Sequence, residues 1–202
     1  MPRPRDVADC IGAYEPLLVL GEDRVRAAVA VVLRWQDEQA QVLFIERASR
    51  HGDPWSGHMA FPGGRVDPGD RGTREAAERE TLEEVGLNLA GGRYLGRLDD
   101  LEGRPEANQR LVVSAYVYWL ADSEPLVPNH EVREAFWFPL SQLLDSERQV
   151  TYPYATYAGK QLPGILVGLP DRHIVWGLTY RFLDVFLSVV GTPLPNHWTD
   201  LR

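Results

Sequence analysis

Three glutamates stand close together in one predicted helix of this chain, and their spacing suggests metal chemistry. Residues 73–85 are rich in helix-forming side chains, with Thr73 as the expected N-cap and Gly86 as the expected C-terminal cap. At about 100° per residue, Glu83 and Glu84 lie within roughly 60° of Glu80 on the helix surface. Carboxylates at this spacing repel one another, and a hard divalent cation such as magnesium, which prefers oxygen ligands, would compensate that repulsion.

The neighbours of this acidic cluster have types that would support a site. Arg79 is predicted to hold one carboxylate in position through a charge-assisted hydrogen bond. The Gly63–Gly64 pair allows a close backbone approach, and Gly63 is a candidate carbonyl ligand. Leu82 and Val85 lie on the opposite side of the helix and are expected to pack on a sheet. An acidic run taken alone is most often a solvated helix face, so the prediction depends on the whole combination.

The remaining pattern predicts an α/β fold in which helices pack on a mixed sheet. Apolar runs and turn residues predict strands at 25–34, 41–47, 58–61, 93–98, 111–120, 135–138, 150–157 and 162–167. A turn is expected at 36–39, an interruption at 62–64, and helices at 7–14, 141–144 and 177–190. No linker divides the chain, so we expect an N-terminal arm over 1–24 and one domain over 25–202.

Composition narrows the function classes. The chain has 202 residues, 21 basic and 29 acidic, for a net charge of −8. This balance argues against a nucleic-acid binder, which would need a basic face. No apolar run approaches the roughly 20 residues of a membrane span, so no membrane partner is expected. The single cysteine, Cys10, fits a reducing compartment and a cytoplasmic protein. The sequence contains no phosphate-binding loop, nucleophile elbow or zinc-ligand spacing.

The segment from Gly64 to Leu87 resembles the Nudix box. That motif is written G-x5-E-x7-R-E-U-x-E-E-x-G-U, where U is aliphatic. Its second half matches from Arg79 onward, except that Thr81 occupies a usually aliphatic position. In the first half Asp70 replaces the glutamate, and eight residues instead of seven separate it from Arg79. The extra residue is expected in the loop before the helix.

This resemblance implies a Nudix α/β/α sandwich that hydrolyses a nucleoside diphosphate linked to another moiety. Water activated by Mg²⁺ or Mn²⁺ would attack one phosphorus of the pyrophosphate. The implied metal-binding positions are Gly63, Glu80, Glu83 and Glu84, with Arg79 as a further catalytic residue. The general base varies within the family. Glu83, Glu131 and Glu134 are the candidates here, with Glu131 narrowly favoured, and ordinary surface charge is the alternative for the last two.

Segments outside the box resemble the coenzyme A pyrophosphatase-like Nudix group. Gly57 and the run from Phe61 to Gly64 match the ending G-x3-F-P-G-G, and residues 173–179 resemble a strand-to-helix junction of that group. An arginine usual four residues before that glycine is replaced by Asp53. The resemblance implies cleavage of coenzyme A or acyl-coenzyme A to adenosine 3′,5′-bisphosphate and 4′-phosphopantetheine. The alternatives are oxidised nucleoside triphosphates, ADP-ribose or dinucleotides as substrates, or an inactive ligand-binding module.

Several side chains are candidates for contacting such a substrate. Arg47, Arg50, His58 and Arg65 are candidates for phosphate contacts, and Trp55 for stacking on adenine. Ordinary surface charge or loop packing is the alternative for each. Three tyrosines, at 152, 154 and 157, are candidates for lining a pocket or for a half-buried strand face. A homodimer is a candidate assembly, with an apolar face such as Leu111 to Leu120.

Overall fold

The computed structural model describes residues 3–21, 23–52, 55–103, 110–121, 125–153 and 161–196. Its helices are α1 (Pro4–Ala13), α2 (Thr73–Val85) and α3 (Gly177–Val189), with short 3-10 turns η1 (Leu89–Gly91), η2 (Leu140–Leu144) and η3 (Ser146–Arg148). Its strands are β1 (Val25–Gln36), β2 (Gln39–Arg47), β3 (Met59–Ala60), β4 (Gly63–Arg65), β5 (Arg93–Arg97), β6 (Leu101–Gly103), β7 (Leu111–Leu120), β8 (Val132–Pro139), β9 (Gln149–Pro153), β10 (Gln161–Leu166) and β11 (Ile174–Val175).

The main sheet is mixed, as the sequence predicted. Its central strands run in the order β3-β2-β1-β7-β5, while β4, β6 and β8 pair with β1, β7 and β2 respectively. The β1–β7 pair is parallel and the other pairs are antiparallel. A second sheet of order β11-β10-β9 lies beside it. The α/β fold class is therefore confirmed.

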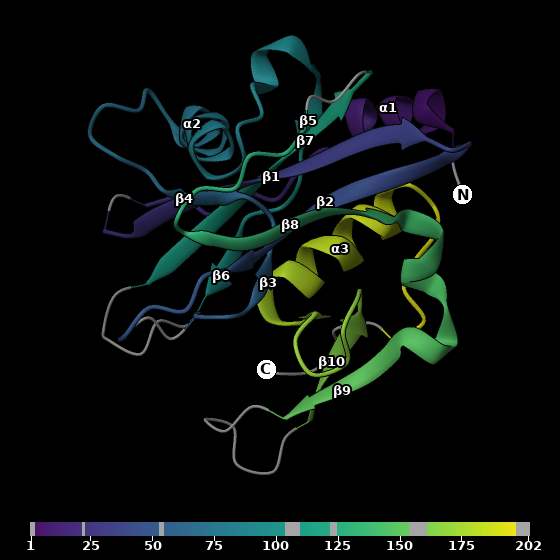
Figure 1. Ribbon diagram of the computed structural model, residues 1–202. Coiled ribbons are helices and arrows are strands. Elements are labelled where there is room, and N and C mark those ends of the chain that lie inside the picture. The colour runs from purple at the N-terminus through teal and green to yellow at the C-terminus, as the bar shows by residue number, and fades with distance from the viewer. Residues whose placement is uncertain are drawn as a thin grey trace.

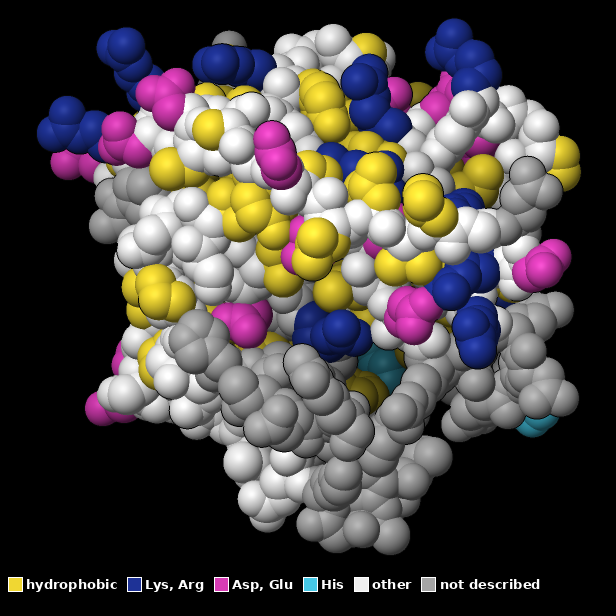
Figure 2. Space-filling model, turned by 180° about the vertical axis from the view of Figure 1, so that it is seen from behind, with side chains coloured by type: hydrophobic (Ala, Val, Ile, Leu, Met, Phe, Trp, Pro, Cys, Tyr) yellow, Lys and Arg dark blue, Asp and Glu magenta, His cyan; other side chains and the backbone are white. Residues whose placement is uncertain are grey.

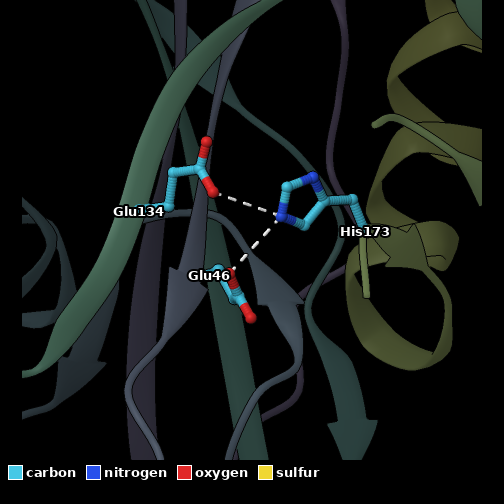
Figure 3. Close-up of side chains that lie close together, drawn as sticks. All are labelled: Glu46, Glu134 and His173. Carbon is cyan, nitrogen blue, oxygen red and sulfur yellow. Dashed lines mark ion pairs between the residues drawn. The ribbon is translucent and has the colours of Figure 1, made fainter. Parts of the chain in front are cut away.

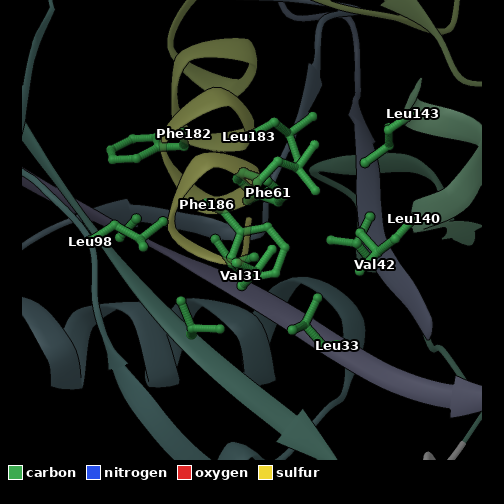
Figure 4. Close-up of a cluster of buried hydrophobic side chains, with 14 of the residues drawn as sticks. Val31, Leu33, Val42, Phe61, Leu98, Leu140, Leu143, Phe182, Leu183 and Phe186 are labelled. Carbon is green, nitrogen blue, oxygen red and sulfur yellow. The ribbon is translucent and has the colours of Figure 1, made fainter. Parts of the chain in front are cut away.

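Helices α2 and α3 lie on opposite faces of the main sheet, which makes the architecture a sandwich (Figure 1). On the α3 face, Phe182 and Phe186 pack with Val31 and Leu33 of β1, as Figure 4 shows. On the α2 face, small residues such as Ala76 and Ala77 pack against the sheet. Because those side chains are short, α2 approaches the sheet closely and its carboxylates lie near the strands.

The N-terminal segment contributes to the main core. Val7 and Ile11 of α1 are buried in the same cluster as the apolar face of α3. The hydroxyl of Tyr14 donates a hydrogen bond of 2.7 Å to Asp99, which fixes the segment after α1 to the sheet. Among the described helices, none is both long and apolar enough to cross a membrane.

Several local expectations were wrong. Gly72, not Thr73, is the N-cap of α2, and the Thr73 hydroxyl instead bonds the Tyr116 hydroxyl at 2.5 Å. The glycines expected to interrupt the chain form β4, because they pair with β1. Strand β7 pairs with β1 on one side and with β5 and β6 on the other, and it is mostly buried, so its apolar residues are not available as a dimer face. Tyr154 and Tyr157 lie outside the described residues.

Candidate functional site

The face that α2 presents to the sheet differs from the expected one. Leu82 was expected to pack on the sheet, but its exposed fraction is 49%, so that prediction was wrong. Thr81 is instead fully buried, and its hydroxyl donates to the Ala77 carbonyl at 2.7 Å. Bonding its hydroxyl back to the helix lets a polar residue occupy the usually aliphatic position. The orientation of α2 that buries Thr81 also buries Glu84 against the strands, and only 2% of Glu84 is exposed.

Burial makes Glu84 the most perturbed carboxyl of the cluster. It accepts a hydrogen bond of 2.9 Å from the Gly63 backbone N–H, which donates from β4. Desolvation raises the pKa of Glu84 to about 8, and the charges of Glu80 and Glu131 add to the rise. The Gly63 N–H and the positive charge of Arg47 act in the opposite direction. A buried carboxyl among other carboxylates is the environment that a bound cation would stabilise.

Glu80 lies against the second glycine of β4. A Cβ atom on Gly64 would come within 2.3 Å of Glu80 Oε1 and 2.4 Å of its carboxyl carbon. The missing side chain therefore makes the space that this carboxylate occupies. Burial raises the pKa of Glu80, although its ion pair with Arg79 opposes the shift. Glu83 is more exposed, and it contacts Arg79 Nη1 at 3.2 Å.

Asp70 holds Arg79 in place through two parallel hydrogen bonds. Arg79 Nε and Nη2 each donate to one Asp70 oxygen at 3.0 Å, and Nη1 donates to Glu80 at 3.0 Å. Asp70 is the residue that departs from the motif in type and spacing, yet its side chain is only 4% exposed. The hydrogen bond from Arg79 lowers the pKa of Asp70. Asp70 is thus a positioning residue that the motif comparison undervalued.

The loop before β8 brings Glu131 to the same cluster. Asn129 donates its backbone N–H to the Glu84 carbonyl at 2.9 Å, and its side-chain oxygen accepts the Glu131 N–H at 2.7 Å. The Glu131 carbonyl accepts from Ala48 N–H at 2.8 Å, which extends the β2–β8 pairing. Asn129 was missed from the sequence, because only the tertiary fold places this loop against the end of α2.

Glu131 and Glu134 lie in different surroundings. Arg50 Nη2 lies 2.7 Å from Glu131 Oε1, and both side chains are partly exposed. Glu134 instead pairs with His173 and Arg172, at 3.3 and 3.4 Å. Of these two glutamates, it is Glu131 whose charge adds to the raised pKa values of Glu80 and Glu84.

The other predicted substrate residues border this cluster to different degrees. Arg47 ends β2, and its backbone N–H and carbonyl bond the His58 carbonyl and the Gly57 N–H, both at 3.1 Å. Arg65 is exposed at the end of β4, and its carbonyl accepts from Arg79 at 3.2 Å. Trp55 is 41% exposed, and its carbonyl accepts the His58 N–H. Asp53 lies outside the described residues.

A second cluster of possible ligands, Glu46, Glu134 and His173, lies elsewhere on the sheet (Figure 3). Glu46 of β2 is 1% exposed and forms a forked ion pair with Arg172. His173 Nδ1 accepts the Leu169 N–H at 3.2 Å, so a neutral ring must carry its proton on Nε2, which faces both carboxylates. A metal ion at Nε2 would have to displace this proton, and Arg172 already occupies both Glu46 oxygens. This cluster is therefore an ion-pair network that ties the segment before β11 to β2 and β8.

The acidic cluster on α2 fits a divalent cation better. Its donors are carboxylate oxygens, and that of Glu84 is deeply buried. Arg79 pairs with Glu80 and Arg50 pairs with Glu131, while Glu84 accepts the Gly63 N–H of β4. Hard oxygen donors of this kind suit Mg²⁺ or Mn²⁺. Figure 2 shows a face of the molecule that is hollowed in its lower half, where a histidine (cyan) lies beside basic and hydrophobic side chains.

Comparisons with known proteins identify the family. The NUDIX domain model matches residues 24–157. Mitochondrial coenzyme A diphosphatase NUDT8 of Homo sapiens is 36% identical over 173 residues, which cover 84% of this chain and 72% of that protein. Uncharacterized protein C14C4.10c of Schizosaccharomyces pombe is 35% identical over 160 residues, which cover 69% of this chain and 49% of that protein, about half its length.

Solved structures agree on the fold. The crystal structure of a MutT/nudix family protein from Enterococcus faecalis has a TM-score of 0.55 and 22% sequence identity. The match covers 94% of this chain and 70% of that one. The chain therefore belongs to the Nudix family and is a hydrolase of phosphorus-containing acid anhydrides.

Proposed function

We propose that this protein is a metal-dependent pyrophosphohydrolase that cleaves coenzyme A or its acyl derivatives. The products would be adenosine 3′,5′-bisphosphate and (acyl-)4′-phosphopantetheine. The observation that carries the reaction class is the meeting of buried Glu84, Glu80 and Glu131 beside the glycines of β4. The choice of substrate is supported by the similarity to NUDT8 and by the Gly57-x3-Phe-Pro-Gly-Gly segment.

The cation would be held by Glu80, Glu83 and Glu84, with the Gly63 carbonyl as a further ligand. When bound, it would neutralise phosphate oxygens and lower the pKa of the attacking water. Arg79 would hold the carboxylates of Glu80 and Glu83 in their binding orientations, and Asp70 would keep Arg79 from turning toward the substrate phosphates.

Glu131 would act as the general base. Its charge acts on Glu80 and Glu84, and its backbone is held by hydrogen bonds to the Asn129 side-chain oxygen and from the Ala48 N–H. Its partner Arg50 has a side chain that is 45% exposed, so a substrate phosphate can draw the guanidinium away from Glu131. Substrate binding would then uncover the base at the moment when the base is needed. Arg47 and Arg65 would complete the phosphate contacts.

A substrate panel tests the proposed function. The purified protein would be incubated with coenzyme A, acetyl-coenzyme A, ADP-ribose, a dinucleotide and 8-oxo-dGTP, with and without millimolar Mg²⁺ or Mn²⁺. We expect adenosine 3′,5′-bisphosphate by mass spectrometry only from the first two compounds and only with metal. Turnover confined to another compound would overturn the substrate assignment, and undiminished turnover after chelation would overturn the metal assignment. Metal binding without any turnover would favour a ligand-binding module.

Replacing Glu131 tests the base. Glu131→Gln is expected to lower kcat by about 10²–10³-fold, because the amide cannot accept a proton, while KM changes little. Glu134→Gln is the matched comparison, since Glu134 lies three residues away in a separate ion-pair network. It is expected to retain kcat within about threefold. Loss of kcat in Glu134→Gln or Glu83→Gln with full activity in Glu131→Gln would reassign the base.

A further inference from the structure

Three aromatic rings from separate parts of the chain, those of His58, Tyr152 and Trp176, pack against one another. The rings of Tyr152 in β9 and Trp176 before α3 stack with centroids 4.3 Å apart and planes 11° apart. The His58 ring meets Trp176 edge-on at 4.8 Å and an interplanar angle of 73°. All three side chains are half-buried, so the ring group retains accessible surface.

Backbone contacts connect this ring group to the proposed catalytic centre. His58 and Arg47 are hydrogen-bonded through their backbones at 3.1 Å, and the positive charge of Arg47 acts on buried Glu84. Thr179, in the first turn of α3, donates its hydroxyl to the Met59 carbonyl at 3.3 Å. One member of the ring group, His58, is therefore the backbone partner of Arg47, whose charge acts on Glu84.

The ring group is also held in a fixed geometry before any ligand binds. Tyr152 pairs with Leu162 in the β9–β10 ladder, and Val175, next to Trp176, pairs with Ile165 of β10. Tyr152 thus lies on β9 and Trp176 directly follows β11, the two strands that flank β10 in one small sheet. A ligand that contacts them would lose little energy in ordering the protein.

We propose that the ring group of His58, Tyr152 and Trp176 is the subsite that binds the planar base of the substrate. This inference rests on the proposed function, because it assigns one end of a nucleoside diphosphate derivative. A flat aromatic base adds a further layer to an existing parallel stack and gains favourable dispersion and quadrupole contacts. A flexible aliphatic chain, such as that of pantetheine, gains less from a planar face. The half-exposed Trp55, which the sequence suggested for stacking, is not part of this parallel stack.

The test compares two small ligands that differ only in the base. Dissociation constants of AMP and ribose 5-phosphate would be measured by calorimetry for the unmodified protein, Tyr152→Leu and Tyr152→Phe. We expect AMP to bind about tenfold more tightly than ribose 5-phosphate. Tyr152→Leu should bring this ratio close to one without changing ribose 5-phosphate binding, and Tyr152→Phe should preserve it. An unchanged ratio in Tyr152→Leu would overturn the proposal.

Two further measurements protect the test against misfolding. Tyr94→Leu removes a partly exposed tyrosine that also packs on two other rings but lies on β5, and it should leave the ratio unchanged. In the unmodified protein, the emission of a 2-aminopurine nucleotide should be quenched on binding, and unquenched binding would overturn base stacking. The substrate panel tests the proposed function and the binding assays test the base subsite, so each proposal can be refuted without the other. A collapsed AMP ratio without coenzyme A turnover would support the subsite and refute the substrate, and coenzyme A turnover with an unchanged ratio would do the reverse.

Discussion

Glu84→Gln is expected to lower kcat about a thousandfold while leaving the metal-free protein at least as stable as the parent. Glu84 is 2% exposed and lies near the charges of Glu80 and Glu131. Glutamine keeps the shape and can still accept the Gly63 hydrogen bond, but it removes an acid whose burial raises its pKa to about 8 and is costly near neutral pH without a cation. Loss of several kcal/mol of metal-based stabilisation in the transition state corresponds to about a thousandfold lower kcat.

Thermal unfolding with and without millimolar Mg²⁺ or Mn²⁺ would check the expected stability, and kcat would check the expected loss of turnover. The parent should gain stability on adding metal, because a ligand that binds only the folded state stabilises it, and Glu84→Gln should lose most of that gain. Glu75→Gln is the control, since Glu75 lies on the same helix but bonds Arg71. Its kcat should stay within about twofold. Full activity in Glu84→Gln would show that this carboxylate is not a metal ligand.

Gly64→Ala is expected to weaken metal binding in a folded protein, whereas Gly63→Ala is expected to destabilise the fold. The Cβ of Gly64→Ala would meet the Glu80 carboxylate at 2.3 Å, which is the end of a flexible side chain. Glu80 can turn away, so the fold should persist while kcat/KM falls by about 10–100-fold through weaker metal binding. The Cβ of Gly63→Ala would meet the Ala28 carbonyl oxygen at 2.2 Å and Val29 Cα at 2.6 Å, at a φ of +152°.

Because those atoms belong to the backbone of β1, Gly63→Ala requires the strand to shift, and we expect it to lower the free energy of unfolding by about 3 kcal/mol or more. Denaturant titration and metal titration of both variants would separate the two effects. Gly69→Ala serves as the control, since nothing lies within 4 Å of its added Cβ. Unaltered metal affinity in a folded Gly64→Ala variant would contradict the placement of Glu80 as a ligand.

Sequence alone determined the elements whose signals are local. The helix formers of residues 73–85, followed by Gly86, predicted α2, and Gly86 adopts the expected left-handed cap with φ of 74°. The β1–β2 hairpin followed from two apolar runs around a polar turn, where Asp37 and Glu38 have positive φ. The spacing of Glu80, Glu83 and Glu84 placed them on one side of a helix, because helical geometry depends only on residue number.

Tertiary structure decided what depends on contacts between distant segments. Helical periodicity could not show that Thr81 faces the sheet while Leu82 is exposed, because the docking angle of a helix is set by the surface it meets. The separation of Glu131 from Glu134 depends on the β2–β8 pairing, which shifts register between Glu46, opposite Glu134, and Arg47, opposite Val132, the residue after Glu131. Three other contacts join residues far apart in sequence or separated by a loop: Asn129 with Glu84, Asp70 with Arg79, and Tyr152 with Trp176. Such pairs leave no periodic signal in one chain, since only packing of the folded sheet and helices brings their side chains within reach.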